Sequence, residues 1–240
     1  ELNNVILNVE DSLDQLSERA SKFFVNIHNK SSNAVYVFPG GTTPILFFNK
    51  IANNIKDWKS TTLILSDERM VDKDNSLSNA YHLNKNLINQ INNLKLPKFL
   101  TFEEFMNPDF NKINKSFDHE LSNINKPTFT LLGFGKDGHI ASLFPNNFNL
   151  NKNKDDQYEV IKNDFDNFYR VSLTLNYLTQ SKNIGFIISG KEKSESLKKS
   201  LFKPYNPVKR PLQYLIKTHK NKINIFCDKE AASGVINEIA

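Results

Sequence analysis

An aspartate and a histidine stand two residues apart in a glycine-rich segment of this 240-residue chain. The segment "GFGKDGHIASLFP" places Asp137 and His139 directly after an apolar run. A neutral imidazole can take a proton from water, so His139 could serve as a general base. Asp137 could orient the imidazole ring or position a water molecule, and it could equally be only a turn former. The pair is therefore a candidate for proton-transfer chemistry, with an exposed turn as the alternative.

The same segment contains a G-x-G-x-x-G spacing at Gly133, Gly135 and Gly138. In dinucleotide-binding proteins such a spacing opens a long helix, and an acidic residue follows about 20 residues later. Here Pro145 interrupts any helix within two turns, and the acids at that distance lie in an asparagine-rich stretch. We interpret the spacing as accidental and expect no nucleotide cofactor.

Glycines and scarce arginines mark a possible anion site in other loops. Gly40, Gly41 and Thr42 follow a strand-like run and open a helix, where backbone N–H groups favour an anion. An ordinary turn capped by the threonine is the alternative. The chain has only four arginines, and Arg69 and Arg170 both lie in polar loops or at strand ends. The planar guanidinium matches phosphate and carboxylate groups, which makes both arginines candidates for anion binding.

Composition excludes several other classes of function. The net charge is +5, but the basic residues are mostly scattered lysines without interleaved aromatic residues, so we expect no nucleic-acid binding. No apolar run approaches the roughly 20 residues of a membrane span, and the first residues do not resemble a signal peptide. We therefore expect a soluble, cytoplasmic protein. The single cysteine, Cys227, is expected to be a small buried hydrophobic residue.

The histidines do not show metal-binding spacing. All five lack the H-x-x-x-H and H-E-x-x-H patterns and a cysteine partner; they are His28, His82, His119, His139 and His219. We expect no metal ion in the site.

Apolar strands and amphipathic helices alternate along the chain. Strands are predicted at 33–38, 61–66, 98–102, 128–133, 169–174, 183–189 and 223–227, and helices at 11–29, 43–54, 78–90, 110–123, 191–200 and the C-terminal end. We interpret residues 146–160 as a surface excursion. The pattern predicts one α/β domain over residues 1–240, with a mostly parallel, doubly wound sheet and helices on both faces. Ligands bind at the carboxyl ends of strands in such sheets, where the polar loops lie.

The motifs together resemble those of the 6-phosphogluconolactonases. The segments are "FPGGTTP", "SDERMV" followed by "LSNAYHL", "LGFGKDGHIASLFP", "RVSLT", "ISGKEK" and "INIFCDKEAA", and they cover about residues 35–233. The most specific motif is D-G-H-x-A-S-L-F-P. Thr42 stands where this family usually has serine, and Asp72 and "PLQYLI" depart from its pattern at the rim of the site. The family shares its fold group with glucosamine-6-phosphate deaminases and ribose-5-phosphate isomerases.

The resemblance implies a reaction. Members of the family open 6-phospho-D-glucono-1,5-lactone to 6-phospho-D-gluconate in the oxidative pentose phosphate pathway, and His139 matches their general base, with Asp137 beside it. The developing oxyanion needs donors, which backbone N–H groups of either glycine turn could supply. We expect a monomer whose partner is this small sugar phosphate.

The resemblance also implies how the substrate is bound. Arg170 and Lys193 are implied to bind the phosphate, because the G-x-x-K spacing from Gly190 favours Lys193 over Lys191. Arg69 is expected to contact the substrate.

Two acidic residues precede Arg69 at the same strand end. Asp67 is expected to lie beside the substrate, and Glu68 is expected only to pair with Arg69 or to face solvent.

Two alternatives to a lactonase remain open. The deaminases resemble D-G-H-I-A-F-N-E-P, with a catalytic carboxylate where this chain has "SLFP". A non-catalytic sugar-phosphate sensor on the same fold is the other alternative, and the intact His139 and Asp137 argue against it.

Overall fold

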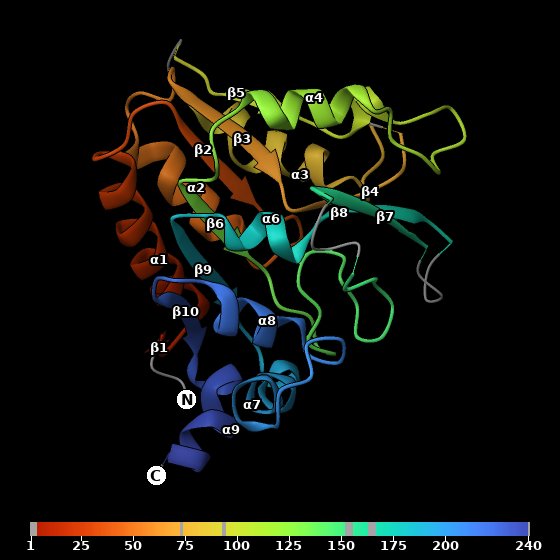
Figure 1. Ribbon diagram of the computed structural model, residues 1–240. Helices are drawn as coiled ribbons and strands as arrows, with labels where there is room; N and C mark the ends of the chain where they lie inside the picture. Colours follow the sequence, from red (N-terminus) through yellow and green to blue (C-terminus); the bar gives the residue numbers. More distant parts are fainter. Residues whose placement is uncertain (1–3, 73, 93–94, 152–155, 163–166, 240) are drawn as a thin grey trace.

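A seven-stranded sheet forms the centre of the computed structural model, which describes residues 4–72, 74–92, 95–151, 156–162 and 167–239 (Figure 1). All neighbouring strands of this sheet are parallel, in the order β1-β10-β9-β6-β2-β3-β5. Their bounds are Val5–Glu10 for β1, Ala34–Phe38 for β2, Thr61–Leu65 for β3, Lys98–Leu100 for β5, Phe129–Leu132 for β6, Asn183–Ile188 for β9 and Ile223–Asp228 for β10. The predicted fold class is confirmed.

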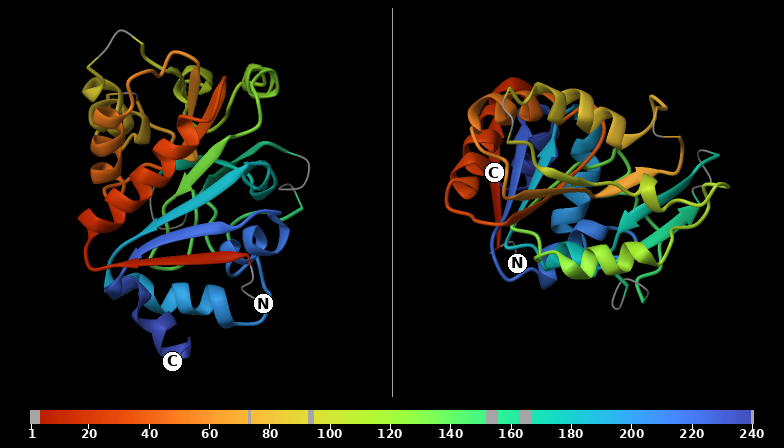
Figure 2. Two further views of the ribbon diagram at one scale, coloured as in Figure 1. Left: turned by 90° about the vertical axis from the view of Figure 1, so that its left-hand side faces the viewer. Right: turned by 90° about the horizontal axis from the view of Figure 1, so that it is seen from above.

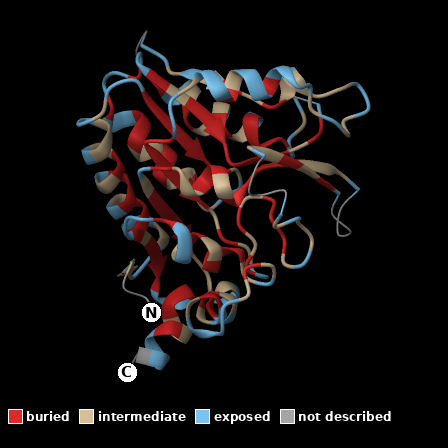
Figure 3. Cartoon of the chain, viewed as in Figure 1, coloured by how far each residue is buried: buried red, intermediate tan, exposed pale blue. Residues whose placement is uncertain are grey.

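Helices cover both faces of this sheet. They are α1 (Leu13–His28), α2 (Ile45–Asn54), α3 (Asn79–Asn86), α4 (Ser116–Asn123), α6 (Leu175–Thr179), α7 (Ser194–Phe202), α8 (Pro211–Thr218) and α9 (Lys229–Ile239). Helices α1 and α2 lie against one face, and α4 and α6 against the other (Figure 2). Buried residues concentrate in the strands and on the inner sides of the helices (Figure 3). No helix among the described residues is long and apolar enough to cross a bilayer.

The strands at the centre of the sheet consist almost entirely of apolar side chains. Every residue of β2 and of β6 is buried, as expected for parallel strands covered on both faces. Phe24 of α1 packs against Tyr36 and Phe38 of β2, with ring centroids 4.7 and 5.5 Å away. These aromatic contacts attach the first helix to the strand that leads into the polar loop at residue 39.

A second, three-stranded antiparallel sheet was not predicted. It consists of β4 (Asp67–Arg69), β8 (Tyr169–Leu173) and β7 (Tyr158–Lys162), in the order β4-β8-β7. We expected residues 146–160 to form a surface excursion. This expectation is wrong for residues 158–160, which belong to β7, and residues 152–155 lie outside the described residues. Strand β7 alternates buried and more accessible side chains, including a buried glutamate, and this composition resembles a loop.

Several element boundaries also differ from the prediction. Strand β1 was missed because it lies at the sheet edge and carries an asparagine and a glutamate. Helix α4 begins at Ser116 rather than near residue 110, and α7 begins at Ser194 after one 3-10 turn over Lys191–Lys193. Helices α6 and α8 are additional, and α8 begins with a proline, which suits the first position of a helix.

The order of the strands reverses between β2 and β6. From β2 the chain runs outward through β3 to β5, and from β6 it runs toward the other edge through β9 and β10. The segments that leave the carboxyl ends of β2 and β6 therefore diverge and leave a crevice between them, which is where ligands bind in open α/β sheets.

Candidate active site

A cavity of about 180 Å³ opens at this crevice. Eight of the nine residues predicted for the site line it: Gly40, Gly41, Thr42, Asp67, Arg69, His139, Arg170 and Lys193. The ninth, Asp137, lies beside His139. The structure therefore brings together loops that follow β2, β3, β6 and β9 with strands of the small antiparallel sheet.

The turn after β6 holds His139 in one orientation. The Nδ1 atom of His139 lies 2.6 Å from Oδ1 of Asp137, which also accepts the backbone N–H of His139. The turn is closed by hydrogen bonds from Gly135 N–H to the His139 carbonyl and from Gly138 N–H to the Gly135 carbonyl. A Cβ atom on Gly135 would lie 2.2 Å from Nδ1, and Gly138 has a φ of +91°, so both positions require glycine.

The hydrogen bond between Asp137 and Nδ1 of His139 leaves Nε2 as the ring atom that can accept a proton. Burial opposes ionisation of Asp137, but the hydrogen bond and the charge interaction with His139 outweigh it and lower the pKa of the Asp137 carboxyl. An ionised Asp137 keeps the proton of the neutral ring on Nδ1. Within the described part of the chain, Nε2 has no protein partner, so it can accept a proton from water.

The G-x-G-x-x-G spacing forms this tight turn and does not open a helix. Residues 139–151 contain turns and one isolated bridge between Ile140 and Leu143. The prediction that no long helix follows this spacing is confirmed. Ala141, which lines the cavity, has a φ of +49°, a conformation that costs energy for a residue other than glycine.

Cations from three segments surround the cavity. Arg69 of β4 and Arg170 of β8 are directly opposite each other in the antiparallel pair. Like charges in such a pair repel, and an anion bound between them would remove the repulsion. Arg69 donates a hydrogen bond of 2.7 Å to the Leu77 carbonyl. Lys193 completes the group, whereas Lys191 is exposed and does not line the cavity.

The loop that carries Lys193 is fixed by an aspartate that the prediction missed. Asp228, at the end of β10, accepts hydrogen bonds from the Ser189 hydroxyl and from the backbone N–H groups of Gly190 and Ala231. Burial lowers the pKa of the Lys193 ammonium, and the nearby carboxylates, including that of Asp228, oppose this only in part. The result is a partly desolvated cation, which binds an anion more strongly than a fully hydrated one.

The loop after β2 presents backbone donors. Gly41 has a φ of +82°, and no side chain caps α2, whose N-cap residue is Pro44, so the alternative of a threonine cap is wrong. Among the described residues, no group accepts a hydrogen bond from the N–H groups of Gly40, Gly41 and Thr42. Backbone N–H groups at the start of a helix are suited to an anion.

Asp67 accepts hydrogen bonds from two serine hydroxyls, one of which lies in the segment after His139. Its carboxylate is almost fully buried and accepts the hydroxyl of Ser66 at 2.8 Å and that of Ser142 at 2.7 Å. The Ser142 N–H donates to the Ser172 hydroxyl. Ser142 therefore attaches the His139 turn to β4 and β8. The prediction missed its role, and the only signal in the sequence was its place within the D-G-H-x-A-S motif.

Glu68 is buried and does not face solvent, which corrects the expectation for this residue. Its two carboxylate oxygens accept the backbone N–H groups of Arg69, Asn79 and Ala80 at 2.7 Å each. The adjacent side chain of Asn79 donates to the Asp67 carbonyl and lies so close to Gly40 that a Cβ there would be 1.9 Å from Oδ1. Glu68 thus fixes the start of α3 and, through Asn79, one wall of the cavity.

The buried Glu68 predicts a pH dependence of stability. Burial raises the pKa of its carboxyl from the ordinary 4.5 to about 7, although the backbone N–H groups and Ser78 act in the opposite direction. The folded protein then binds this proton more tightly than the unfolded chain, so the stability contribution is complete below pH 4.5 and is lost as the pH rises through about 7. We expect Glu68→Gln, which cannot titrate, to remove this decline.

The measurement is the free energy of unfolding by urea across that pH range. Glu104→Gln, at an exposed position, is the matched control and should retain the wild-type pH dependence. An identical pH dependence in Glu68→Gln and wild type would contradict the assignment.

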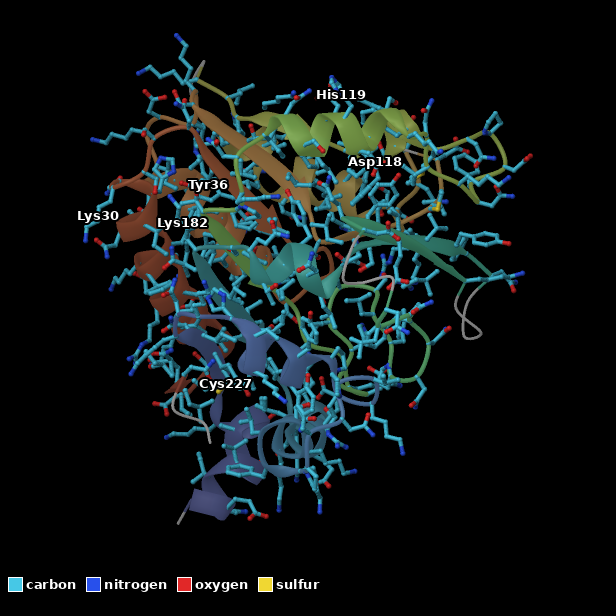
Figure 4. All side chains as sticks on the ribbon, viewed as in Figure 1. Lys30, Tyr36, Asp118, His119, Lys182 and Cys227 are labelled. Carbon is cyan, nitrogen blue, oxygen red and sulfur yellow. The ribbon has the colours of Figure 1, made fainter. Side chains whose placement is uncertain are left out.

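The other histidines and the cysteine lie away from the cavity. Among the described residues, His139 is the one histidine that lines it, and His119 points away from the sheet on the outer side of α4 (Figure 4). Cys227 is fully buried in β10, and burial raises the pKa of its thiol to about 12. It is therefore the small buried hydrophobic residue that the sequence predicted. No group of three or more metal-ligating side chains occurs among the described residues.

Comparisons with known proteins identify the family and agree with the fold. The family model for glucosamine-6-phosphate isomerases/6-phosphogluconolactonase matches residues 8–224. A 6-phosphogluconolactonase from Helicobacter pylori is 28% identical over 222 residues, which are 92% of this chain and 96% of the relative. A glucosamine-6-phosphate deaminase from Colwellia psychrerythraea is 24% identical over 239 residues, with 93% and 87% covered. The crystal structure of a 6-phosphogluconolactonase from Shewanella baltica superimposes with a TM-score of 0.83 at 21% identity, covering 95% of this chain and 99% of that one.

Proposed function

Because the chain belongs to the family of glucosamine-6-phosphate isomerases and 6-phosphogluconolactonases, we propose that it hydrolyses 6-phospho-D-glucono-1,5-lactone to 6-phospho-D-gluconate, a step of the oxidative pentose phosphate pathway. The observation that carries the proposal is the Asp137–His139 pair at a cavity whose other walls hold Arg69, Arg170 and Lys193. A histidine paired with a carboxylate, together with three cationic side chains in one small cavity, supports hydrolysis of a phosphorylated ester.

In the proposed reaction, Nε2 of His139 takes a proton from water as the water oxygen attacks the lactone carbonyl carbon. The carbonyl oxygen becomes an oxyanion, which the N–H groups of Gly40 and Gly41 are positioned to stabilise. The turn at 133–138 is a poorer source of donors, because it uses the Gly135 and Gly138 N–H groups for its own closure. The intermediate then collapses, the ring C–O bond breaks, and the imidazolium returns its proton to the departing ring oxygen.

The phosphate is assigned to the cationic side of the cavity. Arg170 and Lys193 are proposed to bind it, and Arg69 is proposed to contact the substrate beside them. The guanidinium groups suit phosphate oxygens geometrically, and the half-buried ammonium adds charge. Asp67 is proposed to lie beside the substrate at the edge of this cationic group. Its carboxylate accepts a hydrogen bond from the Ser142 hydroxyl and thereby fixes the turn that carries His139.

The side chains beside His139 favour a lactonase over a deaminase. Phe144 occupies the position of the carboxylate in D-G-H-I-A-F-N-E-P and is 7% exposed. Among the residues that line the cavity, Asp67 is the one carboxylate, and both of its oxygens accept serine hydroxyls. A deaminase would need a further acid that this cavity does not provide. We further propose that the protein is a monomer of one domain over residues 1–240 and acts on a cytoplasmic sugar phosphate.

Incubation with two substrates tests the proposal. We expect the protein to accelerate hydrolysis of the phosphorylated lactone above the spontaneous rate and to release no ammonia from glucosamine 6-phosphate. The lactone assay needs a blank without protein, because the lactone also opens in water. Release of ammonia would instead identify a deaminase. Binding of 6-phosphogluconate without turnover of either substrate would identify a sensor.

A further inference from the structure

The ring of Phe144 contacts both functional halves of the cavity. Its centroid lies 4.4 Å from that of the His139 ring, with the two planes inclined by 42°. The central guanidinium carbon of Arg170 lies 5.4 Å from the same Phe144 centroid. Phe144 is almost completely buried and does not line the cavity, so it lies behind the two residues and supports them.

From this arrangement we infer that Phe144 is a positioning residue that holds the general base and the phosphate-binding arginine at a set separation. The inference rests on the proposed function, because it assumes that His139 acts on the carbonyl and Arg170 on the phosphate. It extends that function by naming a residue that links recognition of one end of the substrate to chemistry at the other.

The contact with His139 completes the support of the imidazole. Asp137 holds the ring at its Nδ1 edge, and Phe144 packs against it from the side. A hydrogen bond at one edge still allows the ring to tilt about that bond, and an aromatic neighbour at this distance restricts the tilt. Nε2 is thereby kept toward the cavity.

The guanidinium carbon of Arg170 lies over the face of the Phe144 ring. A cation over an aromatic ring is attracted by the electrons of the ring, and the planar guanidinium fork matches the geometry of phosphate oxygens. The attraction also offsets the repulsion from Arg69, which is directly opposite Arg170 in the β4–β8 pair. Leucine at position 144 would fill most of the volume and supply neither interaction.

The backbone around Phe144 is itself well held. The Asn147 N–H donates to the Phe144 carbonyl, and Asn146 N–H donates to the Val208 carbonyl. Asn146 has a φ of +62°, so the chain turns sharply just after the ring. The backbone that carries the ring is therefore fixed, so the ring packs against His139 and Arg170 from one position.

Phe144→Leu tests the inference, with Phe102→Leu as the matched control. Phe102 is fully buried, packs against Phe117 and does not line the cavity. We expect both variants to lose thermal stability. Only Phe144→Leu should lose activity, about tenfold in kcat/KM on the phosphorylated lactone, because one aromatic pair and one cation–π contact are removed. Its affinity for 6-phosphogluconate should also fall severalfold, whereas Phe102→Leu should retain wild-type values for both.

A double-mutant cycle separates positioning from general packing. Arg170→Lys should weaken 6-phosphogluconate binding strongly in the wild-type background and much less in the Phe144→Leu background, because the ring is what orients the guanidinium. Calorimetric binding supplies this result without turnover. Additive effects, or a Phe144→Leu variant with wild-type kcat/KM, would overturn the inference. A wild-type protein that does not hydrolyse the lactone would instead refute the proposed function.

Discussion

His139→Ala is expected to lower kcat for lactone hydrolysis by about 10²- to 10⁴-fold, the usual contribution of a general base. The substitution removes the Nε2 acceptor and leaves the glycine loop, Arg170 and Lys193 in place. The His139 side chain is 30% exposed, so its loss should change the stability of the fold little. The affinity for 6-phosphogluconate should therefore stay close to that of the wild type.

The measurement is the initial rate of lactone opening at saturating substrate, after subtraction of spontaneous hydrolysis. His119→Ala is the matched control, since this histidine is exposed on the outer side of α4, and it should hydrolyse the lactone at the wild-type rate. A His139→Ala variant with wild-type kcat would eliminate His139 as the base. A variant that lost binding and thermal stability together would show instead that His139 supports the turn.

The second large effect concerns the phosphate. Arg170→Ala and Lys193→Ala are each expected to reduce kcat/KM on the phosphorylated lactone by about tenfold to a hundredfold, because a charge-assisted hydrogen bond contributes roughly 1.5 to 3 kcal/mol. Part of the loss should appear in kcat, since binding energy from the phosphate helps to place the carbonyl beside the water. The slow reaction of unphosphorylated gluconolactone should hardly change in Lys193→Ala.

The exposed Lys191 provides the control for these two variants. Lys191→Ala removes one positive charge from the same loop without touching the cavity, so its kcat/KM should equal that of the wild type on both lactones. Equal losses on the phosphorylated and unphosphorylated substrates would show that Arg170 and Lys193 support the fold or the chemistry. The phosphate site would then have to lie elsewhere.

The central strands of the large sheet were predictable because strands buried on both faces are continuous runs of apolar residues. Strands β2 and β6 consist almost wholly of apolar or β-branched residues, and both were located within one residue. Strand β7 has no continuous apolar run, because its buried positions include a glutamate and alternate with more accessible ones. Strand β4 is three residues long and charged throughout, so its pairing with β8 depends on contacts that no local pattern reveals.

The site shows the same division between local and long-range signals. His139 and the glycine turn were visible because the chemistry and the backbone conformation act within a few residues. Ser142 and Asn79 were missed because their partners lie far away in the sequence. The Ser142 hydroxyl donates to Asp67, 75 residues earlier. The backbone N–H of Asn79 donates to Glu68, and the Asn79 side chain fits beside residue 40 only because Gly40 has no Cβ atom.

The neighbouring positions of β2 and β6 also determine when the site can form during folding. Tyr36 pairs with Phe129, so the excursion through β3 and β5 must close before the two loops at the crevice meet. Closing so long a loop has a large entropic cost and makes folding slow compared with that of proteins rich in local contacts. Neither half of the chain contains both the glycine loop at residues 40–42 and the turn at residues 133–139. Recovery of catalysis during refolding would therefore follow the slow, non-local step and lag behind the formation of the helices.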